Sequence, residues 1–305
     1  MLFKTKYKNL NSSWINKIYL GETPNGKDLS DHLHIIHNRY TGFTEEIATR
    51  CCDLQGKNSY ELLLDTVDVS SHTDILDLAC GNGALLELCK KRFPPDLKLF
   101  GVDMNDNELK LARTRFSKND ISFYKANAQD LSFMKDASKD VIFCHWALTL
   151  MDPVVTVLKT IKRLLKKQGV FSAIVDGDLY SAKGYLEIHN IIYQYVQKKF
   201  PNYGLLELGD PRIRSYKSLN KLIKKIFSNS ETKITPHVLT CKQKPNILAN
   251  QVAGFFYASL ILSSKHYGIL VSKLKDYFTK NQVDGLSEFN LPVNLLVVKQ
   301  TFKSY

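Results

Sequence analysis

The sequence predicts an α/β fold, with helices around a doubly wound and mostly parallel β-sheet. Between residues 72 and 176, short apolar runs of β-type composition alternate with segments of helical spacing. The first apolar run leads into a glycine turn, at Gly81 and Gly83, that opens the first helical segment. Strands that alternate with helices in this way form parallel sheets with helices on both faces.

The elements of this zone can be placed in chain order. Strands are expected at residues 74–78, 98–102, 121–126, 140–144 and 170–175. Helices are expected at residues 84–93, 107–116 and 154–167. Pro94 and Pro95 end the first helix, because proline cannot continue one. In such sheets ligands bind beyond the carboxyl ends of the strands.

Two flanking zones complete the predicted organisation. Residues 1–70 are expected to form an N-terminal helical cap segment, and residues 71–176 the ligand-binding core. Residues 177–305 are expected to supply the remainder of the sheet and two helical substrate-cap insertions, at about 181–210 and 245–285.

Composition and charge narrow the class of protein. The 305 residues are 44% hydrophobic and 24% charged, which is typical of a globular chain and excludes a disordered or collagen-like one. The longest apolar stretch, residues 252–262, is too short to cross a bilayer. The net charge of +12 comes mainly from lysine and favours a solvated surface, although it leaves a nucleic-acid partner open.

Cysteine and histidine positions argue for a reduced compartment and against a metal site. The six cysteines show no C-x-x-C spacing, so we expect free thiols in a soluble, cytoplasmic protein without membrane attachment. His32, His34 and His37 lie close together, but no carboxylate pair is near them, and no metal is expected.

The glycine turn after the first strand favours a particular kind of ligand. Gly81 and Gly83 allow a tight turn and a close approach of a ligand to the backbone, although a plain strand-to-helix turn needs no ligand. A dinucleotide fingerprint would place a glycine at position 86, where this chain has Leu86. Asp77, just before the turn, suits a cationic ligand group better than a phosphate.

Polar residues follow the next strands. Asp103 ends the second strand and could accept both hydroxyls of a ribose, or simply cap the next helix. Asn127 and Ala128 follow the third strand, where an amide and a backbone N–H could read an adenine edge. Together these features describe a pocket for a nucleoside with a charged amino-acid tail and no phosphate.

In these features the sequence resembles the class I S-adenosylmethionine-dependent methyltransferases. Residues 77–83 (D-L-A-C-G-N-G) look like the first motif of that family, with Ala79 where glycine is common. Residues 127–133 (N-A-Q-D-L-S-F) are similar to its adenine motif, with Asn127 for the usual Asp, and residues 161–169 are similar to R-V-L-K-P-G-G.

The resemblance implies a Rossmann-like sheet of seven strands with an antiparallel last strand, the sixth at 232–241 and the seventh at 291–299. It also implies S-adenosyl-L-methionine as cofactor and a set of cofactor contacts. Asp103 would bind the ribose, Met104 would pack on the adenine, and the first-motif backbone would face the methionine. The implied cofactor-binding residues are Asp77, Ala79, Cys80, Gly81, Gly83, Asp103, Met104, Asn127, Ala128 and Cys144.

His145 is the candidate catalytic residue, because it follows the fourth strand where a methyl acceptor should approach. As a general base it would activate a hydroxyl, whereas the alternative is a ring that only packs beside the cofactor. His145→Ala should spare cofactor binding and reduce turnover if the base hypothesis holds. The run Cys144-His145-Trp146-Ala147 lacks the Asn/Asp-Pro-Pro-aromatic motif of nucleic-acid amino methyltransferases.

The cap segments indicate a small acceptor. Helical covers of this kind resemble those of small-molecule methyltransferases, which close a pocket around the acceptor. The candidate pocket residues are Tyr19, Tyr40, Trp146, Tyr185, His189 and Tyr257, although most aromatics of a cap are core. The leading hypothesis is a methyltransferase for a small molecule, and the alternatives are an enzyme acting on RNA or protein and a non-catalytic cofactor-binding module.

Overall fold

The computed structural model describes residues 11–117, 120–204 and 208–301. Its centre is a seven-stranded sheet with the strand order β3-β2-β1-β4-β5-β7-β6. The strands are β1 (Asp74–Leu78), β2 (Lys98–Asp103), β3 (Ser122–Lys125), β4 (Lys139–His145), β5 (Leu165–Asp176), β6 (Glu231–Gln243) and β7 (Ser287–Lys299). The predicted fold class and all seven predicted strands are confirmed.

Strand β7 runs antiparallel to both of its neighbours, and the other paired strands are parallel. The strand order reverses at β1, which pairs with β2 on one side and with β4 on the other. The loops that leave these strands at their carboxyl ends therefore diverge to opposite sides and open a crevice.

Helices cover both faces of the sheet, and alternate strand residues point to different layers. Leu76, Ile142 and Cys144 pack in one core with α7 (Val154–Leu164) and α9 (Tyr216–Ile226). Ile75, Val141 and Phe143 belong to the other core, with α4 (Ser59–Leu64), α5 (Ala84–Arg92) and α6 (Asp106–Thr114). Helix α7 ends three residues before the predicted position 167, because Leu165 is extended and pairs with Lys139 on β4.

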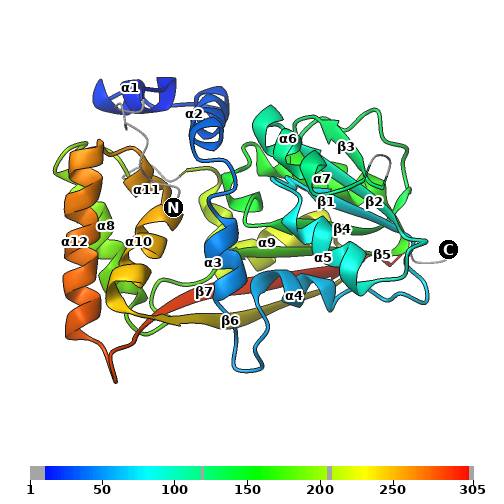
Figure 1. Cartoon of the computed structure of the whole chain (residues 1–305). Coiled ribbons are helices and arrows are strands. Elements are labelled where there is room, and N and C mark those ends of the chain that lie inside the picture. Colours follow the sequence, from blue (N-terminus) through cyan, green and yellow to red (C-terminus); the bar gives the residue numbers. More distant parts are fainter. Residues whose placement is uncertain (1–10, 118–119, 205–207, 302–305) are drawn as a thin grey trace.

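Two helical covers stand over one end of the sheet (Figure 1). The N-terminal cover holds α1 (Ser13–Tyr19), α2 (Gly26–Arg39) and α3 (Glu45–Arg50). The C-terminal cover holds α8 (Tyr185–Gln197), α10 (Pro245–Phe255), α11 (Tyr257–Leu260) and α12 (Ser264–Lys280). Of two short 3-10 turns, η1 (Leu148–Leu150) follows β4, and η2 (Pro211–Ile213) lies between α8 and α9 in the chain.

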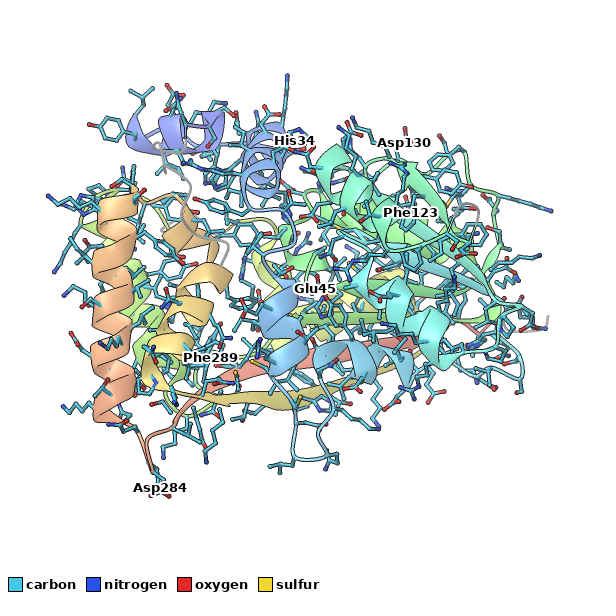
Figure 2. All side chains as sticks on the ribbon, in the orientation of Figure 1. His34, Glu45, Phe123, Asp130, Asp284 and Phe289 are labelled. Atoms are coloured by element: carbon cyan, nitrogen blue, oxygen red, sulfur yellow. The ribbon has the colours of Figure 1, made fainter. Side chains whose placement is uncertain are left out.

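Charged side chains tie the N-terminal cover to the sheet domain. Glu45, at the start of α3, lies in the middle of the molecule (Figure 2) and bonds Arg115 and Asn82. Arg115 also bonds Glu87 of α5 at 2.7 Å. Across the described ranges, the helices are too short or too polar to cross a membrane.

Candidate active site

A cavity of about 480 Å³ lies at the carboxyl ends of β1, β2 and β4, roofed by α2 and α11. Its size is in the range of small-molecule sites. The predicted residues that line it are Asp77, Ala79, Cys80, Gly81, Asp103, Met104, Asn127, Ala128, His145, Trp146 and Tyr257. The structure therefore brings together residues from four separate strand ends.

The loop after β1 has the backbone that its glycines predict. Gly81 and Gly83 have φ angles of +50° and +78°, and Ala79 has +60°, which an L-residue adopts only with strain. Gly83 lies outside the cavity lining. A Cβ built on Gly83 would come within 3.2 Å of Ala112 and Phe116, so this glycine serves the close packing of α5 against α6.

Asp103 is held in place by two backbone donors. The N–H of Gly81 donates to Oδ2 at 2.9 Å, and the N–H of Asn105 donates to Oδ1 at 2.8 Å. Burial raises the pKa of the Asp103 carboxyl, and these two bonds oppose that effect. Each oxygen keeps a lone pair for a further donor, such as a ligand hydroxyl.

Asp77 is one of the cavity residues with a buried polar atom that lacks a hydrogen-bond partner in the described chain. Its side chain is 2% exposed, and its Oδ1 has no hydrogen-bond partner among the described residues. Burial and the nearby Asp103 carboxylate raise the Asp77 pKa. A buried carboxylate without a partner is costly, so this position favours a cationic ligand group that would supply the missing partner.

The His145 ring is fixed by packing and by a hydrogen bond, unlike a general base that is free to meet a substrate. Its Nε2 lies 2.8 Å from Ser59 Oγ, and its ring stacks on Tyr60 with centroids 4.2 Å apart. Burial lowers the pKa of the His145 imidazole to about 3, so the ring is neutral at physiological pH. Ser59 and Tyr60, on α4, gave no signal in the sequence, because their partner is far away in the chain, 86 positions from Ser59.

Trp146 follows β4 in a left-handed conformation, with a φ angle of +51°. Such strain in a bulky residue persists only where the surroundings hold it. The Trp146 ring lies edge-on to Phe255 of α10 at 5.2 Å and beside His145 at 4.7 Å. It forms an aromatic wall between the sheet and the C-terminal cover.

Several predicted residues lie elsewhere, each for a physical reason. Tyr19 ends α1 and is 74% exposed, whereas the buried Tyr40 donates to Leu260 O at 3.3 Å inside the cover. Tyr185 and His189 pack on Phe256 within the C-terminal cover. Cys144 does not line the cavity, because its side chain is fully buried in the core that contains Ile142.

Other lining residues come from segments that the sequence motifs did not mark. His37 and Ser30 lie on α2, and Glu108 lies on α6. His37 bonds both Glu108 and Tyr257. No spacing in the sequence signals this group, since its members are 71 and 220 positions apart.

Comparison with known proteins agrees with this geometry. A family model described as "Methyltransferase domain" matches residues 76–173, which contain β1 through β5 almost entirely. A demethylmenaquinone methyltransferase of Symbiobacterium thermophilum is 36% identical over 101 residues, covering 32% of this chain and 40% of that protein. A malonyl-[acyl-carrier protein] O-methyltransferase of Priestia megaterium is 25% identical over 174 residues, covering 56% of this chain and 58% of that protein.

A solved structure extends the likeness of the fold. A Haemonchus contortus phosphoethanolamine N-methyltransferase, in complex with phosphomonomethylethanolamine and S-adenosylhomocysteine, superposes with a TM-score of 0.54. It is 13% identical, and the match covers 98% of this chain and 71% of that one. The chain thus spans about half the length of the curated relatives it matches, and the shared part is the sheet with its ligand loops. Residues 76–173 therefore match a methyltransferase domain.

Proposed function

We propose that the protein transfers a methyl group from S-adenosyl-L-methionine to a small-molecule acceptor held inside the cavity. The observation that carries the proposal is a covered cavity whose lining combines two kinds of group. The carboxylates of Asp77 and Asp103 lie beside the glycine loop, and the rings of Tyr60, Trp146 and Tyr257 line the same cavity.

The lining residues at the strand ends fit the cofactor group by group. Asp77 Oδ1, which lacks a partner in the described chain, would accept from the ammonium of the methionine part. Asp103, fixed by Gly81 and Asn105, would accept from the ribose hydroxyls. Met104 would pack on the adenine, and Asn127 would read its edge, since both line the cavity.

The bound cofactor supplies an electrophilic methyl on a sulfonium, and the protein's own residues position the acceptor and keep water away. In-line displacement depends strongly on such positioning. We assign His145 and Trp146 to the wall that holds the acceptor. The low pKa of His145 and its bond to Ser59 favour a neutral, fixed ring over a titrating base.

The cover favours a small acceptor over RNA or protein. Helix α2 and helix α11 both contribute lining residues, so the cavity is enclosed from above by two separate segments of chain. A macromolecule would have to displace them to reach the strand ends. Small or carrier-bound acceptors in the names of the curated relatives agree with this preference.

The test supplies methyl-labelled S-adenosylmethionine and a cell extract divided into a low-molecular-mass fraction and a macromolecular fraction. We expect label to appear in the low-molecular-mass fraction and to be absent with Asp103→Ala. Label in RNA or protein would instead support the macromolecular alternative. Binding of the cofactor without transfer to either fraction would favour a non-catalytic binding module.

A further inference from the structure

Three side chains from distant parts of the chain form a continuous line of hydrogen bonds along the cavity wall. Tyr257 Oη on α11 lies 3.0 Å from His37 Nε2 on α2. His37 Nδ1 lies 2.9 Å from Glu108 Oε1 on α6. All three residues line the cavity, and they connect the C-terminal cover, the N-terminal cover and the sheet domain.

The bonding partners settle where the protons of this line reside. Glu108 Oε1 also accepts from the Gly42 N–H at 3.0 Å, which marks it as an acceptor oxygen. His37 Nδ1 therefore carries the proton that it donates to Glu108, and Nε2 keeps its lone pair for the Tyr257 hydroxyl. Tyr257 then has lone pairs on Oη with which to accept a hydrogen bond from a group in the cavity.

The line is held rigidly enough to act as a unit. Phe43 packs against both rings, with centroid distances of 5.3 Å to His37 and 5.2 Å to Tyr257. The Glu108 side chain is 3% exposed, and its Oε2 lacks a partner among the described residues. A buried carboxylate of this kind would stabilise a positive charge on the neighbouring imidazole.

We propose that Tyr257 takes the proton of the methyl acceptor and passes its own proton to His37, with Glu108 holding the imidazole in place. The inference rests on the proposed function and deepens it, since it specifies an acceptor whose nucleophilic oxygen or nitrogen carries a proton. Tyr257 is the catalytic residue of this relay, and His37 and Glu108 are positioning residues.

The relay balances charge and atoms. The acceptor's lone pair forms the new bond to the methyl carbon while the carbon–sulfur bond breaks and its electron pair returns to sulfur. The acceptor's proton moves to Tyr257 Oη as the tyrosine proton moves to His37 Nε2. One positive charge leaves the sulfonium, and one appears on the imidazolium beside Glu108.

This balance makes a prediction that needs no known acceptor. Three titratable groups face His37: Glu108 on α6, Asp103 at the end of β2 and Tyr257 on α11. With the sulfonium bound, the cavity carboxylates have a cationic partner. The neutral product S-adenosylhomocysteine keeps the ammonium but lacks the sulfonium charge, and its complex should take up a proton in compensation.

The experiment is calorimetric binding of S-adenosylmethionine and S-adenosylhomocysteine in two buffers of different ionisation enthalpy, at neutral pH. The wild type should take up more protons with S-adenosylhomocysteine than with S-adenosylmethionine. His37→Asn should lose this difference and Glu108→Gln should reduce it, whereas His34→Asn, on the same helix but outside the cavity lining, should keep it.

Turnover with an acceptor found in the labelling experiment separates the roles further. Tyr257→Phe should keep the proton difference but lose about 100-fold in kcat with little change in KM. Tyr40→Phe, a matched loss of a cover hydroxyl outside the cavity lining, should leave kcat within about twofold. Equal proton uptake with both ligands in the wild type would overturn the relay while leaving the proposed function intact, whereas failure to bind either ligand would refute the proposed function itself.

Discussion

The two halves of the cavity are built in different ways. The cofactor half consists of three short segments at strand ends, residues 77–82, 102–105 and 126–130, and backbone bonds fix its central turn. The cover half consists of side chains from α2 and α11, which meet through the bond between His37 and Tyr257. One half is therefore local in sequence and rigid, and the other is assembled from distant segments by side-chain contacts.

The two halves should therefore differ in local stability and in mobility. Strands β1 and β4 beneath the cofactor half are buried on both faces, whereas α1 and α2 of the N-terminal cover bury one side each, around Trp14, Leu33 and Ile36, and add the bond between Ser12 and His32. Segments with few buried contacts open at lower free energy than core strands. We expect the cover to open for ligand entry while the cofactor loops stay in place.

The largest effect is expected in the N-terminal cover, at His32. This buried ring lies 2.9 Å from Ser12 Oγ through Nδ1, stacks on Trp14 and meets Tyr203 edge-on. Burial lowers its pKa to about 4, below the ordinary value of about 6.5. The unfolded chain therefore binds a proton here that the folded chain does not, and folding stability falls as pH drops below about 6.5.

From these values His32 alone should cost about 2 kcal/mol of stability between about pH 7 and 5. Urea unfolding at several pH values measures this slope. His32→Asn should flatten the slope by about that amount, and the partly exposed His34→Asn should leave it unchanged. An unchanged slope in His32→Asn would show that the cover does not depend on a neutral ring there.

The next effect concerns the cofactor half, at Asp77. Asp77→Asn should weaken S-adenosylhomocysteine binding about 10- to 100-fold, because the neutral amide has no negative charge to pair with the ligand's ammonium. The same variant should raise the Tm of the free protein, since burial disfavours the charged carboxylate. Asp74→Asn, at the far end of β1 and bonded to Lys166, is the control and should not weaken binding.

A smaller effect should appear at Ala79, where the glycine of the family motif is missing. Ala79→Gly should raise the free energy of unfolding by about 1 kcal/mol, because the residue has a φ angle of +60°. Ala112→Gly, in the last turn of α6, should lower it by a similar amount. Denaturant unfolding of both variants gives the comparison, and destabilisation in both would argue against strain at Ala79.

The smallest effect is expected at His145. Because its ring is neutral and bonded to Ser59, it should add no titration to cofactor binding between about pH 6 and 8. His145→Gln should bind S-adenosylhomocysteine within about threefold of the wild type at every pH. A pH step in the wild type that this variant removes would restore His145 as a titrating base.

The sequence predicted the fold well, and it predicted that the glycine loop and Asp103 meet at adjacent strand ends, because both are encoded locally. Alternating runs specify the strands, and the motif around Gly81 and Asp103 places the ligand loops at adjacent strand ends. Position within a strand was less informative, and Cys144 illustrates why. A shift of one residue along β4 moves a side chain from one sheet face to the other, and Cys144 lies on the face of Ile142.

Apart from Tyr257, the cover half escaped prediction because its contacts are tertiary. Tyr19, Tyr40, Tyr185 and His189 share aromatic composition with Tyr257, but only the packing of the cover decides which of them reaches the cavity. The partnership of His37 with Glu108 and Tyr257 depends on a helix crossing between segments far apart in the chain. Helical periodicity predicts on which face of a helix a residue lies, but it does not predict which other segment packs against that face.

The most direct test of the central claim is calorimetric titration of the purified protein with S-adenosylmethionine and S-adenosylhomocysteine, in the wild type, in Asp103→Ala and in Asp106→Ala. Asp106 begins α6, is half exposed and pairs with Lys125, so it is a matched carboxylate outside the cavity lining. We predict binding by the wild type and Asp106→Ala, and no detectable binding by Asp103→Ala. Equal binding by all three proteins would contradict the assignment of Asp103 and the glycine loop as the cofactor site, and no binding by the wild type would contradict the proposed activity.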